Sequence, residues 1–439
     1  MRADPPASRR MLTMQVHAAN SGNLGSPAHT TGVKALPPLY VDLDGTLVAT
    51  DLLHESCLAL LRSSPAKVLQ IPLWLLRGKA FLKQQIASHV TIDTSVLPYR
   101  AAVVDLVRKA RDQGRRVVLA TASDERLAQA VATHLGLFDE VLASDGKTNL
   151  SGIAKLQAIR EDAAGRPFAY AGNERADLKV WQEAQAAIVV SSSRGLRQRA
   201  AQLTQVEQQI DVPKAGLRDV LYGLRLHQWL KNLLVFLPLL PIIEALTREM
   251  LGRAVAMFVA FSLCASAIYV LNDLLDLEAD RHHHRKKARP VAAGVMPIST
   301  AVPMALALLS ASIAITVWWL PPLALVTLAG YVILTTAYST WLKRRMLVDV
   351  FTLALLYTVR ILAGSAATEV EPSFWLLGFS MFMFLSLALA KRHVEIREML
   401  VRAQVAVKGR AYVANDGVFV MATGLAAGQL SILTLSLYL

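Results

Sequence analysis

The sequence predicts a soluble α/β domain with a parallel sheet, followed by an all-α bundle of membrane-spanning helices. Three observations lead to this prediction. The composition changes between Val212 and Leu217, from mixed residues to long apolar runs separated by short charged clusters. Before that point, short apolar strands alternate with helical patterns. After it, about seven apolar runs are long enough, or nearly so, to cross a bilayer.

The net charge of +13 and the cysteine content restrict the class of protein. A strong positive charge suits nucleic acid, a membrane surface or an anionic substrate. The cations cluster at the ends of apolar runs and form no stripe with interleaved aromatic residues, so we expect no nucleic-acid partner. Cys57 and Cys264 are far apart, so we expect neither a disulfide framework nor a metal-binding cysteine pair.

The chain divides into four predicted segments. Residues 1–38 are rich in Ala, Ser, Pro and Gly and lack the apolar core of a signal peptide, so we expect a disordered leader. We assign residues 39–195 to the α/β domain, 196–216 to a linker and 217–439 to the membrane domain.

Seven apolar runs predict the membrane spans. The first, Leu233–Ile243, is short and contains Pro238 and Pro241, so we expect a kinked helix. The others are Ala254–Leu271, Ala301–Leu320, Leu323–Leu342, Leu347–Ala367, Phe374–Ala390 and Gly417–Leu439.

The connections between these spans alternate in charge, which predicts their orientation. Residues 281–289, 343–345 and 391–410 are rich in Lys and Arg, whereas the opposite connections are not. Positive residues stay cytoplasmic, so we expect a multi-pass protein of the inner (cytoplasmic) membrane with its α/β domain on the cytoplasmic side. The cations either serve only as topology anchors or also bind an anionic substrate, and both interpretations stay open.

The segment 272–290 predicts a diphosphate site. Asp273, Asp276 and Asp280 are spaced i, i+3, i+7, which places three carboxylates on one helical face beside Asn272. Such oxygen ligands suit Mg²⁺, which is commonly shared with substrate phosphates. Five cations follow within one or two turns, as an anionic diphosphate requires. They are Arg281, Arg285, Lys286, Lys287 and Arg289.

The run His282-His283-His284 lies in the same segment. It raises the alternative of a transition-metal site, but consecutive histidines do not share a helical face. We therefore expect these side chains to be solvated or to lie behind the metal ligands.

The motif Asn-Asp-x-x-Asp-x-x-x-Asp at 272–280 resembles the signature of the UbiA superfamily of membrane prenyltransferases. The resemblance runs from about Leu217 to the end and is greatest to the decaprenyl-phosphate phosphoribosyltransferase branch. Further shared elements are Leu-Arg-x-x-x-Trp-x-Lys-Asn at 224–232, Arg-Pro-x-Ala-Ala-Gly at 289–294, Tyr-Ser-x-x-Leu-Lys with a later Asp at 338–349, Arg-x-x-Ala-Gly at 360–364 and Lys-Arg-x-x-Glu at 391–395.

This resemblance implies roles for individual residues. Asp273 and Asp276 are catalytic, and together with Asp280 they hold Mg²⁺. The substrate-binding residues it implies are Lys231, Asn272, Arg289, Tyr338, Lys343, Arg360, Lys391 and Arg392.

The chain departs from the family in two respects. Aromatic prenyltransferases of the superfamily carry a second aspartate pair where this chain has Lys391 and Arg392. Cations there suit direct phosphate binding better than a second metal, which favours the phosphoribosyl branch. The family usually has nine spans and we count seven, so either some are missed or the last pair is lacking.

Polar residues in the first half of the chain follow successive predicted strands. Sites of parallel α/β sheets collect at the carboxyl ends of strands, so we expect these residues to converge. Asp42 and Asp44 follow Leu39–Val41, Thr121 follows 116–120, Asn173 and Asp177 follow 168–171, and Lys155 lies on a helix in between.

This order of motifs resembles the haloacid dehalogenase (HAD) superfamily over about residues 38–195, which implies a Rossmann-like α/β fold. By that resemblance Asp42 is the nucleophile that forms an aspartyl-phosphate and Asp44 is the acid/base. Thr121 and Lys155 bind the phosphoryl group, and a second Mg²⁺ site draws on Asp42, Asp44, Asn173 and Asp177. Asn173 stands where the family often has Asp, so either a phosphatase with weakened metal binding or a decayed domain is expected.

Three hypotheses for function follow. The first is transfer of phosphoribosyl from phosphoribosyl diphosphate to a polyprenyl phosphate, after which the HAD-like domain removes the 5-phosphate. The second is alkylation of an aromatic acid such as 4-hydroxybenzoate by a polyprenyl diphosphate. The third is a membrane-anchored scaffold without catalysis. Mg²⁺ and an isoprenoid lipid are expected partners in the first two.

Overall fold

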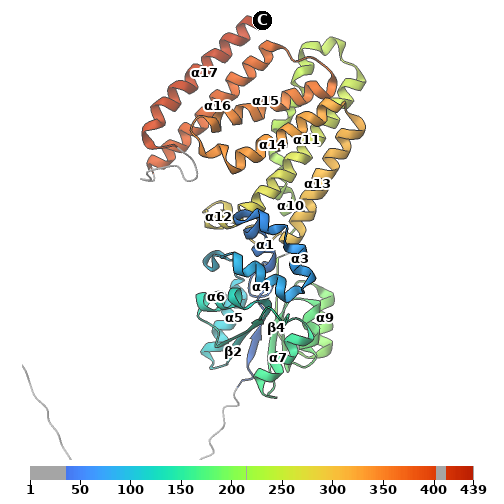
Figure 1. Cartoon of the computed structure of the whole chain (residues 1–439), viewed down its shortest axis with the longest axis vertical. Helices are drawn as coiled ribbons and strands as arrows, with labels where there is room; N and C mark the ends of the chain where they lie inside the picture. The colour runs from blue at the N-terminus through green and yellow to red at the C-terminus, as the bar shows by residue number, and fades with distance from the viewer. Residues whose placement is uncertain (1–35, 214, 402–411, 439) are drawn as a thin grey trace, which may run out of the picture. The chain divides into compact units, whose positions relative to one another are not determined.

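The computed structural model describes residues 36–213, 215–401 and 412–438. The expected leader therefore lies almost entirely outside the described residues. Within them, the α/β domain is built on one parallel sheet with the strand order β3-β2-β1-β4-β5-β6 (Figure 1). The strands are β1 (Leu39–Val41), β2 (Val117–Asp124), β3 (Glu140–Ser144), β4 (Ala169–Gly172), β5 (Ala186–Val190) and β6 (Gln205–Ile210).

Helices cover both faces of this sheet, which is why its central strands are nearly continuous apolar runs. One face packs against α5 (Ala101–Asp112) and α6 (Glu125–Leu135). The other packs against α7 (Ile153–Ala163), α8 (Leu178–Trp181) and α9 (Arg194–Leu203), with η2 (Arg175–Asp177) leading into α8. The prediction of a parallel α/β domain is confirmed.

The sheet extends further along the chain than expected. Residues 196–216 were predicted to be a linker, but they contain most of α9 and all of β6, which pairs with β5. The sequence of β6, Gln-Val-Glu-Gln-Gln-Ile, is mostly polar because an edge strand is covered less than a central one. Because β6 has few apolar residues, a search of the sequence for buried strands does not detect it.

Four helices between β1 and η1 (Thr94–Val96) form a small insert that we call the cap. They are α1 (Leu52–Ser63), α2 (Pro65–Val68), α3 (Ile71–Leu76) and α4 (Lys79–His89). Leu60, Trp74, Leu82 and Ile86 form its apolar core. The side chain of Asp51 accepts a hydrogen bond from the His54 N–H and so caps α1.

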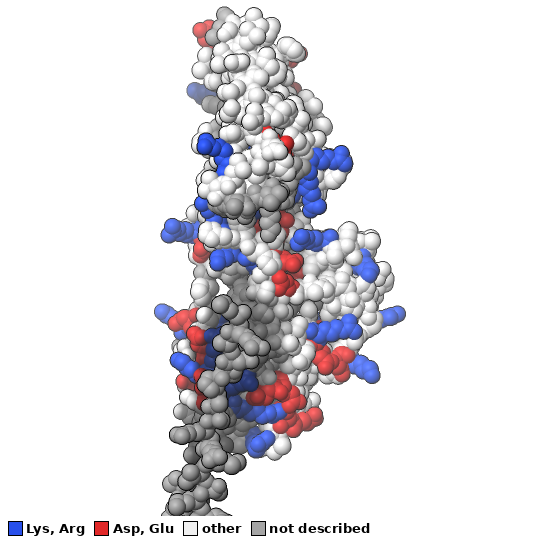
Figure 2. All heavy atoms as spheres, turned by 90° about the vertical axis from the view of Figure 1, so that its left-hand side faces the viewer, with Lys and Arg blue, Asp and Glu red and all other residues white. Residues whose placement is uncertain are grey.

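Seven helices of the described residues are long and apolar enough to cross a membrane, in agreement with the predicted count. They are η3 (Leu226–Ala245), α11 (Arg248–Leu275), α13 (Ile298–Trp319), α14 (Pro322–Thr340), α15 (Val348–Thr368), α16 (Phe374–Val401) and α17 (Gly417–Tyr438). The shorter elements around them are α10 (Leu217–Gly223), α12 (Leu277–His282), η4 (Lys286–Ala288), η5 (Leu342–Arg344) and η6 (Ala414–Asp416). In Figure 2 the upper part of the molecule is almost free of charged side chains, whereas Lys and Arg gather below it.

The first span is kinked, as its two prolines predicted. It is a 3₁₀ helix whose backbone leaves helical angles at Ile242, next to Pro241. Proline lacks an N–H donor and clashes with the preceding turn, so Pro238 and Pro241 interrupt the hydrogen-bond ladder.

Two sequence expectations about the spans need correction. Lys391 and Arg392 were expected in a connection, but α16 continues without a break to Val401. The three motif aspartates were expected on one helical face, but α11 ends at Leu275 and α12 begins at Leu277. Asp276 is the joint, and its backbone at φ −92°, ψ 11° bends the chain there.

The cap packs against one end of the membrane bundle. Leu58 of α1 joins an apolar cluster with Leu274, Leu277 and Ile298. The Arg281 guanidinium donates two hydrogen bonds, of 2.8 and 2.6 Å, to the carboxylate of Glu55, and both side chains are buried. Paired, hydrogen-bonded burial is the arrangement in which such charges are tolerated.

A close approach of Gly364 in α15 to the first span generates a stability prediction. A Cβ at this position would lie 1.9 Å from the Val235 backbone oxygen, so Gly364→Ala should separate η3 from α15. We expect a loss of about 1–3 kcal/mol in unfolding free energy from overpacking, seen as a lower thermal midpoint in detergent. Gly330→Ala in α14 is the matched control, because nothing lies within 4 Å of its added Cβ. Equal midpoints for the two variants would contradict the packing.

Candidate functional site

The HAD-like domain brings its predicted site residues together at the carboxyl ends of three neighbouring strands. Asp42 follows β1, Thr121 lies on β2, and Asn173 follows β4, and these strands are adjacent in the sheet. Lys155 reaches them from the first turn of α7, and its Nζ donates to Asp42 Oδ1 at 2.7 Å.

Lys155 is held by a buried polar network. Its Nζ lies 3.8 Å from Asp177 Oδ1 and donates to the Tyr170 hydroxyl at 2.9 Å. Burial opposes its charge, but the carboxylates of Asp42 and Asp177 outweigh this and raise the pKa of Lys155. The ammonium therefore stays charged beside Asp42, where it can bind a phosphoryl oxygen.

Asp44 is placed for proton transfer. Its Oδ1 accepts from the Leu52 N–H at 2.8 Å and its Oδ2 from the Ser123 hydroxyl at 2.5 Å. Burial, with Asp51 nearby, raises the pKa of Asp44 to about 6. A carboxyl group with such a pKa can both give and take a proton near neutral pH.

The oxygens of Asp42 and Asn173 are the ones that fit a Mg²⁺ ion in this domain. The Thr46 hydroxyl lies 3.2 Å from Asp42 Oδ2 and 3.0 Å from Asn173 Oδ1, which places both oxygens around one point. Gly45 allows this approach, because it has φ +73° and a Cβ there would meet Asn173 Nδ2 at 2.2 Å.

Asp177 has a different environment from the other predicted metal ligands. Its Oδ2 accepts from the N–H groups of Asn173 and Glu174, and its Oδ1 accepts from the Tyr170 hydroxyl. Because both oxygens are used, Asp177 orients the turn and supports Lys155 in this structure.

Sequence reasoning missed Lys83, Ser123 and Tyr170. Lys83 lies on the cap helix α4, and its Nζ donates to the Ala122 carbonyl at 2.6 Å. Burial lowers the pKa of Lys83, although the carboxylates of Asp44 and Asp51 oppose that shift. Lys83 belongs to no recognised sequence motif. Its position in a basic segment of the cap is the only feature of the sequence that points to it.

The membrane domain contains a cavity of about 430 Å³ lined by most of the predicted site. Asn272, Asp273 and Asp276 form its acidic part. The predicted residues Lys231, Lys286, Arg289, Tyr338, Arg360 and Lys391 also line it. Arg225, Gln228, Ser339 and Tyr357 line it as well, although no individual role was predicted for them.

Two guanidinium groups meet at Asp273. Arg225 Nη2 contacts Asp273 Oδ1, and Arg289 Nη1 lies 2.9 Å from the same oxygen. Arg289 also pairs with Asp280, so one arginine joins two motif aspartates across the bend at Asp276. Arg225 has φ +53°, which turns its side chain into the cavity ahead of the first span.

Deeper in the cavity, Arg360 is held by polar and aromatic neighbours. Its Nε donates to Asn232 Oδ1 at 2.8 Å, and the Asn232 amide donates to Ser262 at 2.9 Å. The rings of Phe261, Tyr331 and Tyr357 lie 5.2–5.5 Å from its guanidinium carbon. Such cation–π contacts stabilise a cation that has little access to water.

Three predicted residues do not line this cavity. Asp280 is buried against Arg289 and Lys286. Arg392 is buried in an ion pair with Asp349, at 2.7 Å, and also pairs with Glu395. Lys343 lies on η5, outside the lining residues. Of the Lys391–Arg392 pair only Lys391 faces the cavity, because successive residues of a helix point in different directions.

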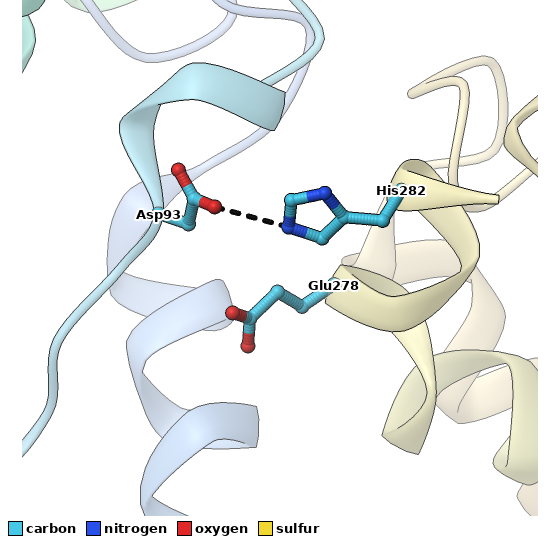
Figure 3. A group of neighbouring side chains, drawn as sticks. All are labelled: Asp93, Glu278 and His282. Atoms are coloured by element: carbon cyan, nitrogen blue, oxygen red, sulfur yellow. Dashed lines mark hydrogen bonds and ion pairs between the residues drawn. The ribbon is translucent and has the colours of Figure 1, made fainter. Parts of the chain in front are cut away.

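The histidine run lies at the junction with the HAD-like domain rather than in the cavity. His282 Nε2 is 3.0 Å from Asp93 Oδ2, with Glu278 one turn away on α12 (Figure 3). The three possible ligand atoms lie within 4.8 Å of one another, but none of the side chains is buried. We interpret this group as a polar contact between α12 and the loop before η1.

The fold and its two sites define a class: a multi-pass membrane protein with a charged cavity among its spans and a second polar site on a parallel α/β domain. Residues 243–439 match the UbiA prenyltransferase family, and residues 39–182 match the haloacid dehalogenase-like hydrolases. The chain therefore carries a UbiA-family domain in its C-terminal part and a HAD-like domain in its N-terminal part.

Individual relatives match either most of this chain or less than half of it. The chain is 37% identical over 407 residues to an uncharacterized protein of Sinorhizobium fredii, y4nM, covering 92% of this chain and 78% of that one. It is 35% identical over 195 residues to the decaprenyl-phosphate phosphoribosyltransferase of Mycobacterium tuberculosis. That match covers 43% of this chain and 64%, less than two thirds, of the relative. A solved UbiA homologue from Archaeoglobus fulgidus, bound to GPP and Mg²⁺, is 17% identical with a TM-score of 0.41, covering 49% and 76% of the two chains.

Asn173 is a neutral candidate ligand in the HAD-like site, and this leads to a prediction about Mg²⁺ affinity. Asn173→Asp adds a carboxylate beside Asp42, so the Mg²⁺ concentration for half-maximal phosphatase rate should fall by roughly tenfold, about 1.4 kcal/mol. The measurement is hydrolysis of a phosphomonoester by the full chain across a Mg²⁺ titration. Asn149→Asp adds the same charge beside Lys83 and is the control. An equal decrease in that variant would show a general charge effect and contradict the ligand assignment.

Proposed function

We propose that the membrane domain transfers a phosphoribosyl group from phosphoribosyl diphosphate to a polyprenyl phosphate. The observation that carries this proposal is the composition of the 430 Å³ cavity. Its acidic part is small, whereas Arg225, Lys231, Lys286, Arg289, Arg360 and Lys391 supply cations around it. Two anionic substrates bound together require this surplus of positive charge.

The acidic part is suited to the leaving group. Mg²⁺ held by Asn272, Asp273 and Asp276 would neutralise the diphosphate and polarise its bond to the ribose. Arg225 and Arg289, which pair with Asp273 in this structure, are near enough to bind the diphosphate oxygens once the carboxylate has another partner.

The transfer balances as a displacement at the ribose C1. The bond from C1 to the diphosphate oxygen breaks, and the diphosphate keeps the electron pair. A phosphate oxygen of the lipid forms the new bond to C1. Arg360, Lys231 and Lys391 hold the lipid phosphate, and the charge that develops on the diphosphate is stabilised by the cations around it.

The name of the mycobacterial relative, which matches 195 residues of this chain, supports the same substrates. The position at 391–395 supports them as well. Lys391 faces the cavity where aromatic prenyltransferases of the superfamily carry a second aspartate pair. Among the described residues that line the cavity, no carboxylate other than Asp273 and Asp276 is present to hold a second diphosphate-bound metal.

We further propose that the HAD-like domain removes the 5-phosphate from the lipid-linked product. The Asp42 carboxylate attacks the phosphorus while Asp44 protonates the leaving ribose oxygen. A water molecule then attacks the aspartyl-phosphate and gives its proton to Asp44, which releases phosphate and restores Asp42. Lys155 neutralises the phosphoryl oxygens that would otherwise repel Asp42.

We propose that both sites face the cytoplasm across the inner membrane. The loops near the cavity carry most of the Lys and Arg of the membrane domain, and such loops stay cytoplasmic. Phosphoribosyl diphosphate and Mg²⁺ are water-soluble and reach the cavity from that side.

The transfer itself is tested with two substrate pairs. Membranes carrying the protein receive radiolabelled phosphoribosyl diphosphate with polyprenyl phosphate, or polyprenyl diphosphate with radiolabelled 4-hydroxybenzoate. We expect label in the lipid fraction only with the first pair, and label only with the second would overturn the proposal. Asp273→Asn should lower the rate by a factor on the order of 10² or more. Glu278→Gln on α12 removes an exposed carboxylate outside the cavity and should leave the rate unchanged.

The role of the HAD-like domain is tested in the same reaction. Wild-type protein should yield polyprenylphosphoryl ribose without a 5-phosphate, whereas Asp42→Asn should stop at the 5-phosphorylated lipid, because the nucleophile is lost. Thin-layer chromatography of the labelled lipids separates the two products. If both proteins yield the same product, the phosphatase proposal fails while the transfer proposal stands.

A further inference from the structure

The cap exposes a group of leucines that the chemistry of neither site uses. Of the eight large hydrophobic side chains exposed among residues 36–213, five lie between Leu61 and Leu76. Leu69 is 81% exposed and Leu76 is 84% exposed, whereas Trp74 between them is buried in the cap core. We call Leu61, Leu69, Leu73, Leu75 and Leu76 the leucine patch. An exposed apolar cluster of this kind marks an interaction surface.

The stretch of sequence that carries the patch has charges of one sign, and Glu278 of α12 pairs with its Arg62 at 3.7 Å. No Asp or Glu occurs between Ser56 and Ile92, whereas Arg62, Lys67, Arg77 and Lys79 lie in this stretch close to the leucines in sequence. Leucines next to exposed cations are the composition of segments that lie in a bilayer surface, where the cations meet anionic headgroups.

The patch also lies next to the end of the membrane bundle that the cap contacts. Helix α1, which leads directly into it, contacts α11 and α13. Leu58 packs with Ile298 and Ala301 in the first turns of the span α13. Figure 1 shows α1 and α3 on the side of the sheet that faces the membrane helices. The leucine patch therefore begins at Leu61, on the same helix as the contact of Leu58 with the end of a membrane span, and continues along the cap to Leu76.

We infer that the leucine patch inserts into the surface of the same bilayer that the bundle crosses, with Lys67, Arg77 and Lys79 on anionic headgroups. The cap then has two attachments at the membrane. One is the packing of α1 on the bundle, and the other is direct contact with lipid. This attachment of the cap to the membrane does not depend on either proposed activity, because it needs only the membrane spans and the exposed cap.

The consequence is a fixed location for the HAD-like site. Lys83 belongs to α4 of the same cap and reaches the strand ends where Asp42 and Asp44 lie. A cap held in the headgroup layer keeps this site beside lipid-linked phosphates and limits how far the domain can move from the membrane.

Depth-dependent fluorescence quenching tests the insertion on the full chain. The background is Cys57→Ser with Cys264→Ala, and single cysteines at Leu76→Cys or Leu69→Cys carry an environment-sensitive fluorophore. The protein is placed singly in nanodiscs that contain anionic lipid and either a shallow or a deep spin-labelled lipid. An interfacial segment lies about 5–10 Å into the headgroup region, so we expect strong quenching by the shallow label and weaker quenching by the deep one.

Leu203→Cys on α9 is the matched control, because it is an exposed leucine of the same domain far from the cap in sequence. It should be quenched by neither lipid. Leu73→Glu should reduce quenching at position 76 several-fold, and removing anionic lipid should reduce it as well. Quenching at 69 and 76 no greater than at 203 overturns the inference. So does shielding of position 76 that appears only when the protein is concentrated in detergent, because the patch would then bind a second copy of the chain.

Discussion

The convergence of Arg225 and Arg289 on Asp273 is the interaction on which the membrane site depends. Carboxylates clustered at the end of a span repel one another. Two guanidinium groups balance their charge: Arg225, directly before the first span, and Arg289, in the segment after α12. The same cations are then available to a diphosphate. One set of charges thus stabilises the free protein and, in the function that we propose, also binds the anionic substrate.

The HAD-like domain also balances the charge of clustered carboxylates with a cation, but it uses different structural elements. Asp42, the nucleophile that we propose, lies beside Lys155, and Asp177 and Tyr170 hold Lys155 in place. In both domains a cation offsets the charge of a buried carboxylate. Lys155 is itself buried, whereas Arg225 and Arg289 are partly exposed. The difference lies in the supporting element, because strand ends orient the groups of one site and helix ends those of the other.

Contacts between the two domains limit how independently they can act. The buried pair Glu55–Arg281 links the first helix of the cap to α12, one residue after Asp280. A Cβ on Gly294 would lie 2.6 Å from the Ala49 carbonyl oxygen, so the Arg-Pro-x-Ala-Ala-Gly segment touches the loop that follows the Asp42 motif. Elements of both sites therefore meet at the junction, where the cap, the loop at Ala49 and Asp93 all contact the membrane domain.

Local pattern determined much of this protein. Apolar runs of sufficient length determined seven spans, and strand-end motifs determined which residues meet around Asp42, because both follow from short-range rules of length and periodicity. Tertiary structure alone decided that Arg392 pairs with Asp349 and that Arg225 and Lys83 face the two sites. It also decided that β6 completes the sheet. The spacing of residues in the sequence predicts which of them share a face of a helix or strand. What that face contacts depends on elements distant in the chain, and a local pattern does not predict those contacts.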